Sequence, residues 1–423
     1  MIEKKESTIS TEDAFLVGVV FGNLSSNKVS EHLDELELLA KTAGANVVHT
    51  YTQKLNRINP SFFIGPGKAQ LIIEHAKSLN VNLIIFDDEL SPAQIKNFSN
   101  LSKSIKVIDR SSLILEIFSQ HAKTKEAKTQ VELAQLEYML PRLTRAWTHL
   151  ERQMGGIGTR AGAGETQIEV DRRLVRTRIS NLKKELDKID KERETQRKNR
   201  KENYKVALAG YTNAGKSTLM KALSGSNVFI QDQLFATLDT TIRSVEIDKS
   251  HTVLLSDTVG FIRKLPHNLV ASFRSTLKEV IESDLILIVL DSSNEYIDDH
   301  IKTITSVLDD IGAKNPTQIV LNKIDLIKSK SRFEFLKNLF PDGIYVSALD
   351  QLRLDSLKKS ITKAMDKDRI VTELKLPYDR PKEIAFSQQD VEIIKRDYKD
   401  DHIFLKIRGS AKRIDQIKIM VKK

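Results

Sequence analysis

Two glycines followed by a lysine and a serine stand in the stretch KVALAGYTNAGKSTL, which runs from Lys205 to Leu219. Their spacing, G-x-x-x-x-G-K-[ST], lets backbone N–H groups wrap a polyphosphate, and the N-terminus of a following helix adds partial positive charge. In such a loop the Lys216 ammonium binds the β- and γ-phosphates, and the Ser217 hydroxyl is a ligand of Mg²⁺. We therefore expect phosphate contacts from Gly210, Tyr211, Thr212, Asn213, Ala214, Gly215, Lys216, Ser217 and Thr218.

Two later segments carry groups suited to Mg²⁺ and the γ-phosphate. Thr237 lies in the polar loop LFATLD, from which its hydroxyl can reach both. Asp257 and Gly260 form a D-x-x-G sequence at the end of an apolar run, where the carboxylate holds Mg²⁺ through water and the glycine N–H faces the γ-phosphate. The expected contacts are Phe235, Ala236, Thr237, Leu238 and Asp239, together with Asp257, Thr258, Val259 and Gly260. The expected Mg²⁺ ligands are Ser217, Thr237 and Asp257.

Two motifs nearer the C-terminus predict which base is bound. An aspartate in N-K-x-D accepts hydrogen bonds from guanine N1–H and the exocyclic amine, which adenine cannot both offer. A later S-A-x sequence is typical of the loop whose backbone contacts guanine O6. The residues concerned are Asn322, Lys323, Ile324 and Asp325, followed by Ser347, Ala348 and Leu349. The motifs together predict a Mg²⁺-dependent GTPase with Lys216, Thr237 and Gly260 as its catalytic residues.

Two positions in these motifs bear on the rate of hydrolysis. Related GTPases hold a monovalent cation at the position of Asn213, which leads to the hypothesis that potassium is a second cofactor. In Ras-like enzymes a glutamine after D-x-x-G orients the attacking water, but Phe261 stands there in this chain. A phenyl ring cannot make that hydrogen bond, so we expect slow hydrolysis by the isolated protein.

The elements that position these motifs are buried parallel strands. Apolar runs precede the motifs at residues 206–209, 253–257, 285–290, 318–321 and 343–346. Short apolar runs that end in polar loops are typical of an α/β sheet buried on both faces. We therefore predict a Ras-like P-loop domain over residues 202–368.

Composition sets the remaining limits. The 423 residues, 40% of them hydrophobic, are enough for two or three domains. The chain has no cysteine, and it shows neither a signal-peptide core nor an apolar run of the ~20 residues that a membrane span needs. We expect a cytoplasmic protein that is a monomer in solution.

The first 121 residues predict a separate parallel α/β domain. Strands are expected at 15–21, 46–51, 82–87 and 105–108, and helices at 30–43, 67–79, 92–101 and 112–121, with Ser91 as an N-cap. Lys68 follows the turn Gly65-Pro66-Gly67, but the spacing of a Walker phosphate-binding motif is absent around it. A solvated lysine and a binding role are about equally compatible with this pattern.

Residues 122–201 predict an antiparallel helical hairpin. Leucines and other apolar residues recur at alternating spacings of three and four in two series, Leu133, Leu136, Leu140, Leu143, Trp147 and Leu150, then Val175, Ile179, Leu182, Leu186 and Ile189. Pro141 should kink the first helix, and the Gly-rich stretch 154–164 should form the tip.

Positive charge is concentrated in this hairpin. The net charge of the chain is +10, and residues 171–201 hold 13 Lys or Arg against 6 Asp or Glu. We expect RNA contacts from Arg160, Arg172, Arg173 and Arg176, on helices also rimmed by Arg142, Arg145, Arg152 and Arg178. A structural spacer with solvated faces is the alternative.

Residues 369–423 predict a small α+β domain. The alternating sequence 402–408 is typical of a strand, residues 389–398 look helical, and a last helix is expected at 411–421.

The chain resembles the HflX family of ribosome-associated GTPases over essentially its whole length. The resemblance lies in FFIGPGKAQLI, in QVELAQLEYMLPRLTRAW and GGIGTRAGAGETQIEVDRRLVRTRI of the hairpin, and in GYTNAGKSTL, LFATLD, DTVGFI and NKID. It implies binding to the large (50S) ribosomal subunit, with the hairpin directed toward rRNA, and a role in ribosome splitting, rescue or large-subunit handling under stress. The C-terminal segment matches the family least clearly.

Two other functions fit parts of the pattern. A GTP-dependent switch could recruit a protein partner through the hairpin, and a response to ribosomal subunits would separate the two cases. Peripheral membrane association is weaker because no lipidation motif or apolar helix face accompanies the charge.

Overall fold

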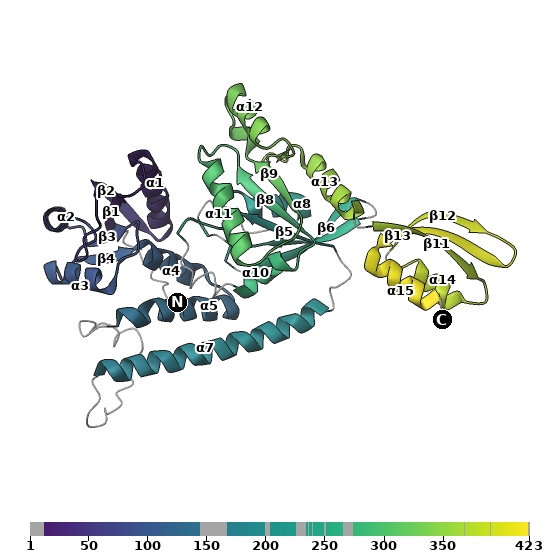
Figure 1. Cartoon of the computed structure of the whole chain (residues 1–423), viewed down its shortest axis with the longest axis horizontal. Helices are drawn as coiled ribbons and strands as arrows, with labels where there is room; N and C mark the ends of the chain where they lie inside the picture. Colours follow the sequence, from purple (N-terminus) through teal and green to yellow (C-terminus); the bar gives the residue numbers. More distant parts are fainter. Residues whose placement is uncertain are drawn as a thin grey trace, which may run out of the picture. The chain divides into compact units, whose positions relative to one another are not determined.

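The computed structural model describes residues 12–143, 167–198, 204–225, 234–235, 237–238, 240–248, 251–264, 274–367, 369–389 and 391–421 (Figure 1). The chain divides into two compact units. The first comprises Met1–Arg193, Ile230–Thr240 and Val259–Leu277, and the second comprises Glu194–Phe229, Thr241–Thr258 and Lys278–Lys423. None of the described helices is long and apolar enough to cross a membrane.

The N-terminal part of the first unit is a parallel sheet with the strand order β2-β1-β3-β4, as predicted. Its elements are β1 (Glu12–Val20), α1 (Ser26–Thr42), β2 (Ala45–Lys54), α2 (Pro66–Ser78), β3 (Leu83–Phe86), α3 (Pro92–Leu101), β4 (Lys106–Asp109) and α4 (Arg110–His121). Ser91 caps α3 in a capping box with Gln94, which confirms the predicted helix start. The strands pack against α2 and α3 in a hydrophobic core that includes Phe15, Ile84 and Phe86.

The predicted hairpin is present in the described residues as α5 (Lys125–Met139) and α7 (Gln167–Lys198), which lie side by side in Figure 1. Its seam contains Leu133, Leu136, Leu143, Val175 and Leu182. The cross-helix contacts Glu126–Arg193, Glu132–Arg178 and Leu143–Arg172 advance along the first helix as they move back along the second, so the helices are antiparallel.

Pro141 lies in a 3-10 turn, Leu140–Arg142, that follows α5 directly. Proline has no N–H to continue the α-helical ladder, which explains why the helix stops before it. Trp147, Leu150 and the Gly-rich stretch 154–164 lie outside the described residues.

The second unit contains a six-stranded sheet with the order β10-β9-β8-β5-β7-β6. Five strands are parallel and match the predicted runs: β5 (Tyr204–Gly210), β7 (His251–Asp257), β8 (Leu285–Asp291), β9 (Thr317–Asn322) and β10 (Ile344–Tyr345). The helical elements are α8 (Lys216–Ser224), α11 (Ile297–Asp310), η2 (Ile324–Leu326), α12 (Lys330–Leu339) and α13 (Leu354–Lys367), and α10 (Arg274–Ile281) begins in the first unit and ends in the second.

The sequence did not reveal β6 (Thr241–Asp248), which pairs antiparallel with β7 at the sheet edge. Only Val245 and Ile247 of this strand are buried, so it lacks the continuous apolar run that marked the other strands.

The C-terminal part is α+β, as predicted, with β11 (Arg369–Pro377), α14 (Pro381–Ser387), β12 (Glu392–Tyr398), β13 (His402–Ser410) and α15 (Ala411–Val421). The predicted helix at 389–398 is wrong, because β12 pairs with β13 there. Val391 and Ile393, two residues apart, contact the core beneath the sheet, so tertiary packing overrides the local helical pattern. The sequence also did not reveal β11, the other neighbour of β13.

Candidate nucleotide-binding site

The loop between β5 and α8 has a backbone that only certain residues tolerate. Asn213 and Gly215 have positive φ angles of 59° and 88°. A Cβ atom on Gly215 would lie 2.3 Å from Asn322 Nδ2, and one on Gly210 would lie 2.4 Å from the Val289 carbonyl oxygen. Both glycines of the motif are therefore required by close approach of neighbouring strands, and Asn213 is a residue type that accepts the left-handed conformation.

Lys216 is held at the centre of this loop. Its Nζ donates to the carbonyl oxygens of Gly210 at 3.1 Å and Tyr211 at 2.9 Å, and the side chain is buried. Burial lowers the pKa of Lys216 to about 8, although the nearby Asp257 carboxylate acts in the opposite direction. An anion at the loop would restore the charge balance of this buried ammonium.

Ser217 and Asp257 are brought together, as the sequence predicted for two Mg²⁺ ligands. The Ser217 hydroxyl donates to Asp257 Oδ2 at 2.6 Å, because β5 and β7 are parallel neighbours whose ends meet at one edge. A hydroxyl and a carboxylate oxygen are ligands that Mg²⁺ accepts. Thr212 Oγ1 is buried with no hydrogen-bond partner among the described residues, so the loop also contains a polar group that fits a bound phosphate oxygen.

Asn322 joins the phosphate loop to the S-A-x sequence. Its Nδ2 donates to the Ala214 carbonyl at 2.9 Å, and its Oδ1 accepts from the Ala348 N–H at 2.9 Å. Beside it, Lys323 has a φ of 61° and its Nζ lies 2.8 Å from Asp291 Oδ2.

The rest of the predicted base-binding set is found at the same strand ends. Asp325 is exposed in η2, whose Ile324 N–H donates to the Val346 carbonyl. Ser347 and Ala348 are buried, whereas Leu349 is exposed. The structure therefore brings N-K-x-D and S-A-x together beside the loop.

The predicted Thr237 segment belongs to the first unit, within Ile230–Thr240. The Phe235 ring contacts Phe118 edge-on with centroids 4.6 Å apart, and its carbonyl oxygen lies 3.0 Å from His121 Nδ1. Burial lowers the pKa of His121, so this contact involves a neutral imidazole near neutral pH. Thr237 is partly buried and Leu238 is buried, while Ala236 and Asp239 lie outside the described residues.

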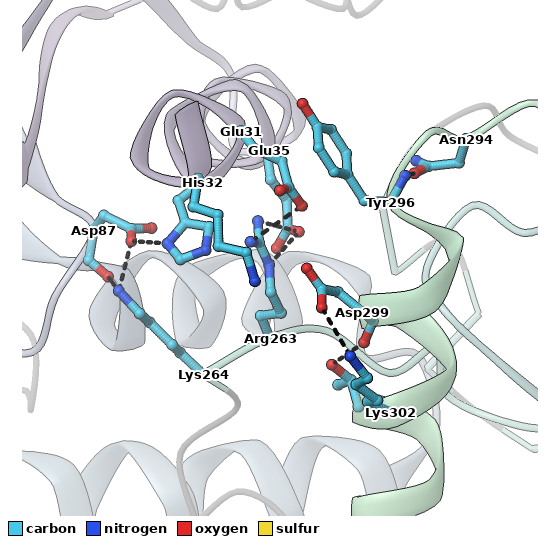
Figure 2. Close-up of polar contacts among 12 residues, drawn as sticks. Glu31, His32, Glu35, Asp87, Arg263, Lys264, Asn294, Tyr296, Asp299 and Lys302 are labelled. Carbon is cyan, nitrogen blue, oxygen red and sulfur yellow. Dashed lines mark hydrogen bonds and ion pairs between the residues drawn. The ribbon is translucent and has the colours of Figure 1, made fainter. Parts of the chain in front are cut away.

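The residues after Asp257 and Thr258 also belong to the first unit, from Val259 onward. Val259, Gly260 and Phe261 are buried. Figure 2 shows Arg263 beside Glu35 and Glu31 of α1, at 2.9 Å and 3.3 Å, and Lys264 beside Asp87 after β3, at 2.6 Å. Lys264 also lies 2.6 Å from Asp88.

This acidic cluster, defined as Glu31, Glu35, Asp87 and Asp88, is also neutralised from the start of α4. The buried Arg110 guanidinium pairs with Asp87 at 2.8 Å and with Glu35. Burial alone would raise the pKa of Asp87, but the hydrogen bond from His32 and the charges of Arg110 and Lys264 hold it well below its usual range. Sequence reasoning missed the cluster because Arg263 and Lys264 are about 180 to 230 residues away from it in the chain and no local pattern marks such pairs.

The predicted RNA-binding arginines of α7 differ in their surroundings. Arg172 donates to the Leu143 carbonyl at 2.8 Å, whereas the Arg173 and Arg176 side chains are exposed. Arg160 lies outside the described residues. Arg142, expected at the rim, is instead buried and pairs with Glu89 at 2.9 Å and Asp109 at 3.5 Å, because it anchors the 3-10 turn to the N-terminal sheet.

Three family models match successive parts of the chain. "GTP-binding GTPase N-terminal" matches residues 30–119, "GTP-binding GTPase Middle Region" matches 121–200, and "50S ribosome-binding GTPase" matches 205–323.

Curated relatives extend the similarity over most of the chain. The GTPase HflX of Flavobacterium psychrophilum is 54% identical over 78% of this chain and 78% of its own length. The GTPases HflX of Caldanaerobacter subterraneus and Escherichia coli are 42% and 41% identical, over 93% and 86% of this chain and 90% and 86% of their own lengths.

Proposed function

The chain belongs to the HflX family of GTPases, and on that basis we propose that it hydrolyses GTP on the large ribosomal subunit and so splits or rescues ribosomes, or handles large subunits, under stress. The observation that carries the hydrolytic part is the contact between Ser217 and Asp257 beside the buried Lys216. The match to the 50S ribosome-binding GTPase model supports the ribosomal part.

The proposed contacts with the nucleotide involve the phosphate loop and the base-binding loops. The backbone N–H groups of residues 211–218 and the Lys216 ammonium bind the phosphates, while the Gly210 and Tyr211 carbonyls orient that ammonium. The Asp325 carboxylate accepts hydrogen bonds from the N–H groups of guanine. Asn322 links the phosphate loop to the S-A-x loop through its two hydrogen bonds.

Mg²⁺ fits the contacting oxygens of Ser217 and Asp257, where it would neutralise charge that develops on the phosphates, and Thr237 is the third proposed ligand. Gly260 would donate its N–H to the γ-phosphate. Asn213 is the proposed potassium ligand, and its backbone has the left-handed conformation.

The hairpin is the proposed RNA-contacting part. Arg173 and Arg176 are exposed on the described helix, and Arg172 and Arg160 are further members of the proposed set. We propose the division of the chain into parts at 1–121, 122–201, 202–368 and 369–423. We propose that the protein acts in the cytoplasm, where its ribosomal partner is found, and that it is a monomer in solution.

Cosedimentation with purified subunits tests the proposal. We expect the protein to pellet with large subunits in the presence of a non-hydrolysable GTP analogue and to remain in the supernatant with GDP. Small subunits serve as the control. Equal, weak pelleting in both nucleotide states would instead favour the switch that recruits a protein partner through its hairpin.

A further inference from the structure

The first residue after Gly210 in the phosphate loop makes a contact that no motif predicts. The Tyr211 ring stacks on the imidazole of His300, with centroids 3.8 Å apart and planes inclined by 6°. Tyr211 is 4% exposed and His300 is 8% exposed. The contact joins the loop to the first turn of α11, where the His300 N–H donates to the Tyr296 carbonyl.

Tyr211 carries two of the hydrogen bonds that shape the loop. Its carbonyl oxygen accepts from the Lys216 ammonium at 2.9 Å and from the Ala214 N–H at 3.2 Å. A rotation of the Tyr211 peptide would therefore displace the lysine and open the turn together.

The loop needs such support because its backbone is costly. Asn213, which is not a glycine, has a positive φ of 59°, and a conformation of that kind persists only where its surroundings fix it. On one side, Asn322 holds the Ala214 carbonyl, so the middle of the loop is fixed. The Tyr211 ring is the side chain that fixes its start.

We propose that His300 is a positioning residue for the phosphate-binding loop, acting through its stack on Tyr211. The inference rests on the proposed phosphate-binding role of the loop. A parallel, nearly buried stack restricts rotation about Tyr211 χ1 and so holds the carbonyl that orients Lys216. The phosphates need the same loop conformation in the ground state and in the transition state. Loss of the stack should therefore weaken nucleotide binding more than it lowers kcat.

Titration of the full-length protein with fluorescent GDP and with a non-hydrolysable GTP analogue tests this inference. His300→Ala removes the ring, His300→Leu fills much of the volume without a ring face, and His300→Phe restores an aromatic face. Ile304→Val is the matched control, since Ile304 is fully buried one turn further along α11 and its shortening loosens the helix without changing the stack.

We expect His300→Ala and His300→Leu to weaken both affinities by about fivefold and to raise KM for GTP by a similar factor, with a smaller change in kcat. His300→Phe should return the affinity to within about twofold of the parent, while Ile304→Val lowers Tm and leaves Kd unchanged. In a Tyr211→Ala background, His300→Ala should add no further loss, because the two rings act as one contact.

Three results would overturn the inference. The first is an unchanged Kd in His300→Leu, and the second is a His300→Phe variant that binds nucleotide as weakly as His300→Ala. The third is a Tyr211→Ala/His300→Ala double variant whose loss of affinity is the product of the two single losses. Lys216→Ala separates the premise from the inference, since nucleotide binding that survives this change would refute the role of the loop itself.

Discussion

At the residue scale, the base-recognition set tests the guanine assignment. Asp325 is exposed in η2, so its carboxylate is accessible to a ligand. Asp325→Asn should exchange guanine preference for xanthine preference, because an amide donates where the carboxylate accepted. The measurement is competitive binding of GTP and XTP. GTP affinity that stays within about twofold of the parent would contradict the assignment.

Asn213 tests the potassium hypothesis. Equal hydrolysis rates in potassium and sodium buffers would already speak against it. Asn213 has a φ of 59°, so Asn213→Gly keeps the backbone conformation and removes only the amide, whereas Asn213→Ala adds about 1 kcal/mol of backbone strain. We expect both variants to lose potassium stimulation and Asn213→Gly to keep nucleotide affinity. Full stimulation in Asn213→Gly would exclude the side chain as a ligand.

Local motifs made the nucleotide site largely predictable from sequence. The contacts of Lys216, Ser217 and Asn322 follow from short patterns at strand ends, because parallel strands bring their carboxyl ends to one edge. The stack of Tyr211 on His300 was not predictable, since 89 residues separate the rings and an isolated histidine on a helix carries no signal.

At the element scale, α7 tests the phosphate contacts of the hairpin. Arg173→Gln/Arg176→Gln should reduce the slope of log affinity for large subunits against log salt by roughly 0.7 to 0.9 per lost phosphate contact. Lys314→Gln/Lys337→Gln is the matched control, because it removes the same charge from exposed positions of the second unit. Identical slopes in parent and hairpin variant would support the spacer interpretation.

The acidic cluster predicts how acid affects the first unit. The pKa of Asp87 is lowered in the folded protein, so its ion pairs stabilise the fold above the ordinary aspartate pKa of about 3.9 and lose that contribution as pH falls below it. Urea unfolding should show this loss in the parent protein between about pH 4 and pH 2.

Asp87→Asn should destabilise the first unit by about 3 kcal/mol at neutral pH, because it leaves Arg110 and Lys264 with one partner fewer, and it should flatten the acid dependence. Asp88→Asn is the control, since Asp88 is more exposed and we expect at most about 1 kcal/mol. A parent and an Asp87→Asn variant with equal acid sensitivity would rule out this role.

Element prediction failed where packing, not local pattern, decides the structure. The sequence 389–398 has a helical pattern, but β13 offers it a partner and the core accepts its alternating residues, so β12 forms. By contrast, the hairpin was predictable because a seam of period 3.5 has few other interpretations.

At the scale of the whole molecule, the first unit takes in pieces of chain from two distant places. Segments Ile230–Thr240 and Val259–Leu277 belong to it, although the motifs around them assign both to nucleotide binding. The side chains of Phe235, Arg263 and Lys264 make the contacts, with α4, α1 and the end of β3. Sequence periodicity identified the elements but did not assign these two segments to the first unit. That assignment depends on ion pairs between residues far apart in the chain.

The same arrangement bears on how hydrolysis is controlled. Phe261 is 2% exposed and cannot orient a water, so Phe261→Ala should leave basal hydrolysis nearly unchanged. A group other than Phe261 must then order the attacking water, and we propose that the large subunit brings this about by fixing the segments around Thr237 and Gly260.

Single-turnover phosphate release, measured with and without purified large subunits, tests this account most directly. We predict slow release by the protein alone and at least about tenfold faster release with large subunits, equivalent to about 1.4 kcal/mol of barrier. Lys216→Ala should abolish turnover in both conditions, and small subunits should have no effect. Fast unassisted hydrolysis that collapses in Phe261→Ala, or a rate that large subunits leave unchanged, would contradict the account.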